Sequence, residues 1–139
     1  MKKVLFCGTA NLDYFIYSKS LPIEGVTIKG NFEQNAGGKG ANQAVACSKL
    51  GNNPFFYTRL SNDMAGKYLY SSLTSNGVKT KAIKTVKNNK SGVALIFVDE
   101  KARNLIGIAP GLNEMMPKKE IKNALNLLKK DDIVVCEMG

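Results

Sequence analysis

The sequence predicts an α/β fold in which helices flank a mainly parallel sheet and a small β flap lies beside that sheet. Short apolar runs alternate along the chain with segments of helical periodicity, an order typical of parallel sheets covered by helices. Two further regions alternate apolar and polar residues, as half-exposed strands do. With 139 residues, of which 44% are hydrophobic and 22% charged, the chain is expected to form one soluble domain.

The first elements are a strand, two half-exposed strands and a helix. The apolar run "KKVLFCG" ends in glycine and predicts a buried strand. Alternating residues at 13–18 and 26–35 predict the two half-exposed strands. A helix is expected from residue 40 to its glycine stop at Gly51. Its small apolar residues are Ala41, Ala44 and Val45.

The middle of the chain continues with a strand and a second helix. The strand is expected at 53–60, and the helix after it is capped by Ser61 or Asp63 and closes at Gly77. Helical spacing selects an apolar face for this helix. That face comprises Met64, Tyr68, Leu69 and Leu73.

The last third of the sequence predicts a hairpin, a helix and a strand. Two strands joined through a charged turn are expected within 91–111. A helix is expected over 117–130, because proline suits its first turn and apolar residues recur on one face. That face comprises Ile121, Ala124, Leu125 and Leu128. The run "DDIVVCEMG" (131–139) predicts another buried strand.

The residue inventory excludes several kinds of catalytic site. The chain contains no histidine, so Ser-His-Asp and Cys-His catalysis are impossible within it and most zinc sites lose their usual ligand. Cys7, Cys47 and Cys136 are scattered among apolar residues, which predicts buried reduced thiols. No apolar run approaches the roughly 20 residues of a membrane span. We therefore expect a cytoplasmic protein without a membrane partner.

The net charge of +9 raises the question of nucleic-acid binding. The densest basic patch is 79–90, with five lysines but neither arginine nor an aromatic side chain. Base stacking and bidentate guanine contacts require those missing types. A solvated surface strand and turn is therefore preferred over a nucleic-acid interface for this segment.

The segment "NAGGKGANQAVACSKLG" (35–51) places three glycines around one lysine. It does not fit a P-loop, because Glu33 stands where the first glycine belongs, and it does not fit the dinucleotide fingerprint, because Gln43 replaces the last glycine. What remains is a glycine loop at a helix N-terminus. Lys39 and Asn42 add donors suited to a polyhydroxylated ligand, although a tight turn with a helix cap is an equally good interpretation of the loop alone.

A second polar pair follows the first predicted strand. In "GTANLD", Asn11 and Asp13 are two residues apart and share a face if the strand continues. A carboxylate that accepts hydrogen bonds from two hydroxyls, beside an amide that both donates and accepts, can orient a sugar. The pair by itself is more typical of a turn or cap than of a site, and the glycine loop strengthens the sugar-site interpretation.

Together these segments resemble a known family. The sequences "GTANLD", "GGKGANQA", "SNDMAG", "GVALIFVDEKARNLIGIAPGLN" and "DDIVVCEMG" occur in the order seen in the ribokinase branch of the ribokinase/PfkB carbohydrate kinases. The resemblance covers essentially the whole chain. It implies a partial ribokinase-like fold, with 1–139 as a single N-terminal part and lid strands around 14–35 and 92–108. The implied activity is ATP-dependent phosphorylation of D-ribose to ribose 5-phosphate.

The resemblance also implies residue roles. Asn11, Asp13, Gly38, Lys39 and Asn42 match the positions that hold the sugar in this family. The sugar-binding glutamate of the family aligns with Gly139, and Glu137, two residues earlier, is a candidate substitute. Lids of this family pair, so a homodimer through the lid strands is expected.

The remaining expectations concern what the 139 residues can do alone. The resemblance implies ATP, Mg²⁺ and a monovalent cation such as K⁺, but the catalytic aspartate, the anion hole and most of these sites belong to a half of the fold that is absent from the sequence. We therefore expect no kinase turnover from this chain. The alternatives, in order, are a non-catalytic sugar-binding or dimerisation module and a basic nucleic-acid binder.

Overall fold

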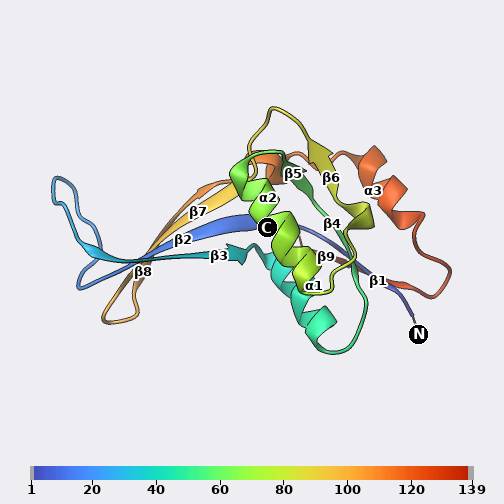
Figure 1. The fold of residues 1–139 in the computed structure, drawn as a ribbon, viewed down its shortest axis with the longest axis horizontal. Helices are drawn as coiled ribbons and strands as arrows, with labels where there is room; N and C mark the ends of the chain where they lie inside the picture. The colour runs from blue at the N-terminus through green and yellow to red at the C-terminus, as the bar shows by residue number, and fades with distance from the viewer. Residues whose placement is uncertain (1, 138–139) are drawn as a thin grey trace.

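The computed structural model describes residues 2–137, which form three β sheets and three α-helices (Figure 1). The strands are β1 (Val4–Cys7), β2 (Asn11–Ser18), β3 (Gly30–Gly37), β4 (Phe55–Tyr57), β5 (Arg59–Ser61), β6 (Lys84–Val86), β7 (Gly92–Asp99), β8 (Asn104–Ala109) and β9 (Ile133–Cys136). The helices are α1 (Lys39–Lys49), α2 (Met64–Ser75) and α3 (Lys118–Leu125), with 3-10 turns η1 (Thr80–Ala82) and η2 (Gly111–Glu114). None of the helices described is long and apolar enough to cross a bilayer. The predicted α/β class is confirmed.

A three-stranded parallel sheet, in the order β4-β1-β9, carries the core. Successive strand residues point to opposite faces. Phe6 and Phe56 therefore pack on one face with residues of α1 and α2. Leu5 and Tyr57 pack on the other face with Ala124 of α3. Because apolar side chains cover both faces of β1 and β4, each of these strands is a nearly continuous apolar run.

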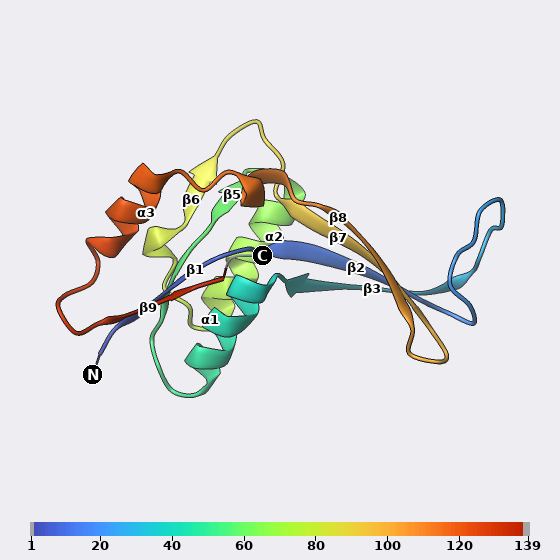
Figure 2. The same ribbon diagram turned by 180° about the vertical axis from the view of Figure 1, so that it is seen from behind.

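A separate four-stranded sheet has the order β3-β2-β7-β8. Strand β2 runs antiparallel to β3 and parallel to β7, and β8 returns antiparallel to β7. Both ribbon views show this sheet extending away from the helices (Figures 1 and 2). Its alternating polar and apolar residues match this exposed position, as the sequence predicts for strands outside the parallel sheet.

Asp63 joins the start of α2 to the segment that enters β7. Its Oδ1 accepts hydrogen bonds from the Gly66 amide at 2.8 Å and the Ser91 hydroxyl at 2.7 Å, and its Oδ2 accepts from the Ser91 amide at 2.9 Å. Burial alone would raise the pKa of Asp63, but these hydrogen bonds outweigh it and lower the pKa. Of the two predicted caps, Asp63 is the one observed.

The buried face of α2 differs from the prediction. Leu69 and Leu73 are buried as expected, but Met64 is 79% exposed and Tyr68 is also exposed. A side chain at Gly66 would overlap the backbone of β5, so the helix lies against that strand with its glycine inward. This close contact rotates Met64 and Tyr68 away from the core, and the sequence contained no direct sign of it.

The C-terminal elements are shorter or more exposed than predicted. Helix α3 ends at Leu125, which is exposed, instead of continuing to residue 130. Strand β9 was expected to be buried, yet Ile133 and Val134 are 45% and 42% exposed, and Cys136 is exposed. Within residues 2–137, β9 pairs only with β1 and forms the edge of its sheet. An edge strand lacks the neighbours that would bury its side chains.

The strand predicted at 53–60 is two strands in the structure. Strand β4 belongs to the parallel sheet, whereas β5 leaves it after Thr58 and pairs with β6. Strand β6 lies within the lysine-rich segment 79–90, together with η1. The partner for β5 thus comes from a segment that was expected to be a solvated strand and turn.

Candidate functional site

A cavity of about 360 Å³ lies between the carboxyl end of the parallel sheet and the four-stranded sheet. Its volume is within the usual range of small-molecule sites. It also lies where ligands bind in parallel α/β sheets, beyond the ends of the strands. The structure brings all the residues proposed from the sequence together in its lining: Asn11, Asp13, Gly38, Lys39, Asn42 and Glu137.

Asn11 and Asp13 lie at the start of β2. From the sequence they were expected on a continuation of the first strand, but β1 ends at Cys7 and a new strand begins at Asn11. Both side chains nevertheless share one face of a strand and line the cavity. Burial raises the pKa of the Asp13 carboxyl above its ordinary value. A Cβ atom on Gly37 would overlap the Asp13 carboxylate. Glycine at position 37 therefore provides the space that the carboxylate occupies.

The glycines of the loop before α1 pack against protein backbone. Gly38 has φ +94°, and a Cβ atom there would lie 2.6 Å from the Cα of Ala10. A Cβ atom on Gly40 would lie 2.8 Å from the Cα of Gly8. The Ala41 amide also donates to the Thr9 carbonyl at 3.0 Å. The loop therefore needs glycine to fit closely against the connection between β1 and β2, a reason that the sequence alone did not reveal.

Lys39 and Asn42 extend from the first turn of α1 and are exposed. Lys39 is the only cationic side chain that the described residues contribute to the cavity. The first turn contains no acidic residue, and Gly38 offers no side chain to cap it. Partial negative charge on a ligand oxygen is favoured at such a helix N-terminus.

Glu137 follows β9 and reaches the cavity from the end of the parallel sheet. Its Oε2 accepts hydrogen bonds from the Thr9 amide at 3.1 Å and the Thr9 hydroxyl at 2.8 Å. Its own amide donates to the Cys7 carbonyl at 2.9 Å. Gly139, the position with which the family glutamate aligns, lies outside the described residues. Glu137 therefore occupies the cavity lining as the sequence suggested for a substitute.

An apolar wall of the cavity was not anticipated from the sequence. It consists of Ala94 and Ile96 of β7 with Ile106 and Ile108 of β8, and these pairs are aligned across the two strands. Pro110 and Asn113 complete that side. Alternating isoleucines occur in any half-buried strand, so the pattern could not assign them to a binding site. Asn113 is the last residue of the segment "GVALIFVDEKARNLIGIAPGLN" quoted above. Its position shortly after a predicted strand was the signal that could have marked it as a site residue.

The two walls have different chemistry. One carries amide, carboxylate and ammonium groups, and the opposite one is aliphatic. A polyhydroxylated ring or chain matches both, because its hydroxyls need many donors and acceptors while its C–H groups pack on apolar surface. The arrangement is suited to binding and orienting a sugar.

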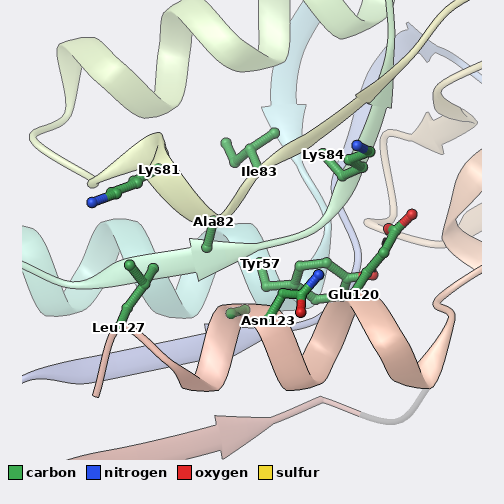
Figure 3. A pocket seen from close by; sticks show the side chains of 9 residues that line it. Tyr57, Lys81, Ala82, Ile83, Lys84, Glu120, Asn123 and Leu127 are labelled. Carbon is green, nitrogen blue, oxygen red and sulfur yellow. Dashed lines mark hydrogen bonds between the residues drawn. The ribbon is translucent and has the colours of Figure 1, made fainter. Parts of the chain in front are cut away.

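A second cavity, of about 300 Å³, lies between α3 and the segment of η1 and β6 (Figure 3). The Tyr57 hydroxyl donates to Glu120 at 3.1 Å, and the Arg59 Nε lies 3.2 Å from the same carboxylate oxygen. Burial, followed by the nearby Glu120 carboxylate, raises the pKa of Tyr57, so the hydroxyl stays protonated. The hydrogen bond from Tyr57 and the ion pair with Arg59 tie Glu120 of α3 to the strands beneath it, which gives this cavity a structural explanation.

Comparison with known proteins assigns the family. The family model for pfkB family carbohydrate kinases matches residues 1–138. The chain is 34% identical over 132 residues to a ribokinase from Dictyostelium discoideum and to a deoxyribokinase from Salmonella typhi. Each match covers 94% of this chain, but only 42% and 43% of the two relatives.

A solved structure agrees with this assignment. The structure of Arabidopsis thaliana ribokinase complexed with ribose and ATP is 30% identical and has a TM-score of 0.79, covering 97% of this chain and 45% of that chain. The chain thus spans less than half the length of each of these three proteins. The family match over nearly all of its residues shows that the chain belongs to the pfkB family of carbohydrate kinases.

Proposed function

We propose that this chain carries the sugar site of an ATP-dependent ribokinase, which transfers a phosphoryl group from ATP to the 5-hydroxyl of D-ribose. The observation that carries the proposal is the convergence of Asn11, Asp13 and the loop 37–42 on one cavity. These segments are the ones that the family resemblance assigns to sugar binding. Because one relative is a deoxyribokinase, 2-deoxyribose is the second candidate substrate.

Each polar residue has a distinct part in this proposal. Asp13, as a carboxylate, accepts hydrogen bonds from sugar hydroxyls. Lys39 and Asn42 donate to sugar oxygens from the first turn of α1. The isoleucines of β7 and β8 pack on the C–H face of the sugar and exclude water. A dry, closed site favours transfer of the phosphoryl group to the sugar over its loss to water.

Phosphoryl transfer itself requires more than these residues provide. A base must lie near the attacking hydroxyl, and positive groups or backbone amides must surround the γ-phosphate. The carboxylates that line the cavity are Asp13, which orients the sugar here, and Glu137, which already accepts two hydrogen bonds from Thr9. Within residues 2–137, no group of three or more His, Cys, Asp or Glu side chains is placed to hold a metal ion.

Titration of the 139-residue chain with ribose by calorimetry tests the proposal. We expect saturable heat with ribose, a smaller or equal response with 2-deoxyribose, and no ADP release in a coupled assay with ATP. ADP release would show that these residues also complete the catalytic site. Absence of heat with both sugars would contradict the sugar-site proposal.

We further propose that the four-stranded sheet pairs with a second copy of the chain. Its face away from the cavity exposes Phe32, Leu95 and Leu105 by 62%, 53% and 50%. Exposed apolar surface of this kind is typical of protein interfaces.

The substitution Leu95→Asp is expected to convert a dimer to a monomer. The side chain of Leu95 points away from the cavity, because its neighbours Ala94 and Ile96 line it, so the sugar site is left intact. Analytical ultracentrifugation should find twice 15.1 kDa for the unaltered chain and 15.1 kDa for the variant. Leu50→Asp, at a residue that is 81% exposed outside this sheet, is the control. Equal masses for the unaltered chain and Leu95→Asp would exclude this interface.

A further inference from the structure

Asn113, in η2 directly after β8, holds the connection between β1 and β2. Its Oδ1 accepts a hydrogen bond from the Ala10 amide at 3.1 Å, and its Nδ2 donates to the Ala10 carbonyl at 3.1 Å. The second Nδ2 hydrogen donates to Oδ1 of Asn11 at 2.7 Å. The side chain therefore uses both of its amide hydrogens. It connects to Ala10 and Asn11, which lie 103 and 102 positions earlier in the chain.

The Ala10 backbone determines the orientation of the Asn113 side-chain amide, that is, the positions of its oxygen and its nitrogen. A backbone N–H only donates and a backbone carbonyl only accepts, so the Asn113 oxygen must face the first and its nitrogen the second. The nitrogen then presents a donor to Asn11, and only the Asn11 oxygen can accept it. The Nδ2 group of Asn11 is consequently the end that Asn113 leaves for a ligand.

Gly92 supplies a second observation that points to this pair. A Cβ atom at this position of β7 would overlap both the Nδ2 of Asn113 and the Oδ1 of Asn11. Gly92 is paired with Asn11 across the sheet, and its φ lies outside the left-handed region, so its backbone does not require glycine. The space for the hydrogen bond between the two asparagines explains the glycine.

We propose that Asn113 is a positioning residue that turns Asn11 into a hydrogen-bond donor toward the sugar. This inference rests on the proposed sugar-binding function. Asn11 then donates to a hydroxyl oxygen while Asp13, two residues along the same face, accepts from a hydroxyl hydrogen. Together they match the two hydrogen-bonding capacities of a sugar hydroxyl, the accepting oxygen and the donating hydrogen, and Asn113 controls the first of these contacts through Asn11.

A double-mutant cycle on ribose affinity distinguishes positioning from a purely structural role. Asn113→Asp replaces the donor beside Asn11 with an acceptor, which forces the Asn11 amide to turn its nitrogen away from the sugar. We expect the ribose Kd to rise about tenfold or more, as for loss of a ligand hydrogen bond. In an Asn11→Ala background the same change should alter the Kd by less than about twofold, because Asn113 acts through Asn11. Asn123→Asp, at an exposed residue outside the sugar cavity, controls for the added charge.

The outcomes separate this inference from the proposed function. Additive effects in the cycle, or unchanged affinity in Asn113→Asp, would overturn the positioning role while leaving sugar binding in place. If the unaltered chain bound no ribose, the function proposal would fail, and NMR of the Asn11 side-chain amide would decide the orientation by itself. Asn113→Asp should shift the Asn11 Nδ2 resonances, because they would then donate to the introduced carboxylate. Unshifted resonances would contradict the inferred orientation.

Discussion

Replacing Asp13 with alanine is expected to weaken ribose binding by about 100-fold or more. The substitution removes a charged acceptor that serves sugar hydroxyls, and hydrogen bonds to charged groups contribute about 1.5 to 3 kcal/mol each. Calorimetric titration of Asp13→Ala against the unaltered chain measures the effect. Glu33→Ala removes a carboxylate from the same face of the four-stranded sheet but outside the cavity lining, and should bind ribose normally. Equal affinity of Asp13→Ala and the unaltered chain would remove Asp13 from the site.

The raised pKa of Asp13 adds a pH dependence to this expectation. Burial raises the pKa of the folded carboxyl above its ordinary 3.8, so its contribution to stability is present below the unfolded pKa and is lost as the pH rises through the folded one. The ionised carboxylate therefore disfavours the ligand-free fold at neutral pH. Asp13→Asn should unfold at the same or a higher temperature than the unaltered chain while binding ribose more weakly. Ribose affinity of the unaltered chain should fall as the pH is lowered through the raised pKa.

Gly38→Ala is expected to destabilise the fold by about 3 kcal/mol or more. Alanine is strained at φ +94°, and its Cβ atom would lie 2.6 Å from the Cα of Ala10 and from the Thr9 carbonyl oxygen. Neither backbone atom can move without shifting the connection that leads to Asn11. Ribose binding should weaken together with stability, as measured by urea denaturation and calorimetry.

Gly51→Ala is the matched control for this prediction. Gly51 also has a positive φ, of +87°, but outside its chain neighbours no atom lies within 4 Å of a Cβ atom built on it. The free energy of unfolding of Gly51→Ala should fall only by the cost of placing alanine at a positive φ, about 1 to 2 kcal/mol. The difference between the two variants reports the close approach of residue 38 to Ala10 and Thr9 together with the extended ψ of 134° at Gly38. If both variants lost the same stability, the packing explanation for Gly38 would be wrong.

The fold could be predicted in outline because its strongest signals are local. Apolar runs such as 4–7 and 55–57 have the length and composition of buried parallel strands, and alternating residues identify the strands of the second sheet. The buried face of α2 was harder to predict. Met64 and Tyr68, which are exposed, fit the helical spacing as well as Leu69 and Leu73 do, which are buried. Packing of Gly66 against β5 decided between them. The exposure of β9 likewise depends on which strands neighbour it.

For the candidate site, the motif residues were the predictable part. Asn11, Asp13, Lys39 and Asn42 have unusual chemistry at short spacing, and that combination is visible in a linear sequence. Ile106 and Ile108 could not be assigned in the same way, because their side chains have no chemistry that distinguishes a cavity wall from a core. Only the pairing of β8 with β7 places them opposite the polar residues.

The sequence by itself determined the α/β class, the glycine loop at a helix N-terminus and the polar residues that a sugar site needs. These features depend on neighbours a few positions apart, so periodicity and composition record them. The tertiary structure decided that Glu137 and Thr9 meet, that Asn113 donates a hydrogen bond to Asn11, and that the loop glycines fit against Ala10 and Gly8. Such contacts join residues far apart in the chain, and they follow from the packing of whole elements, which local patterns do not encode.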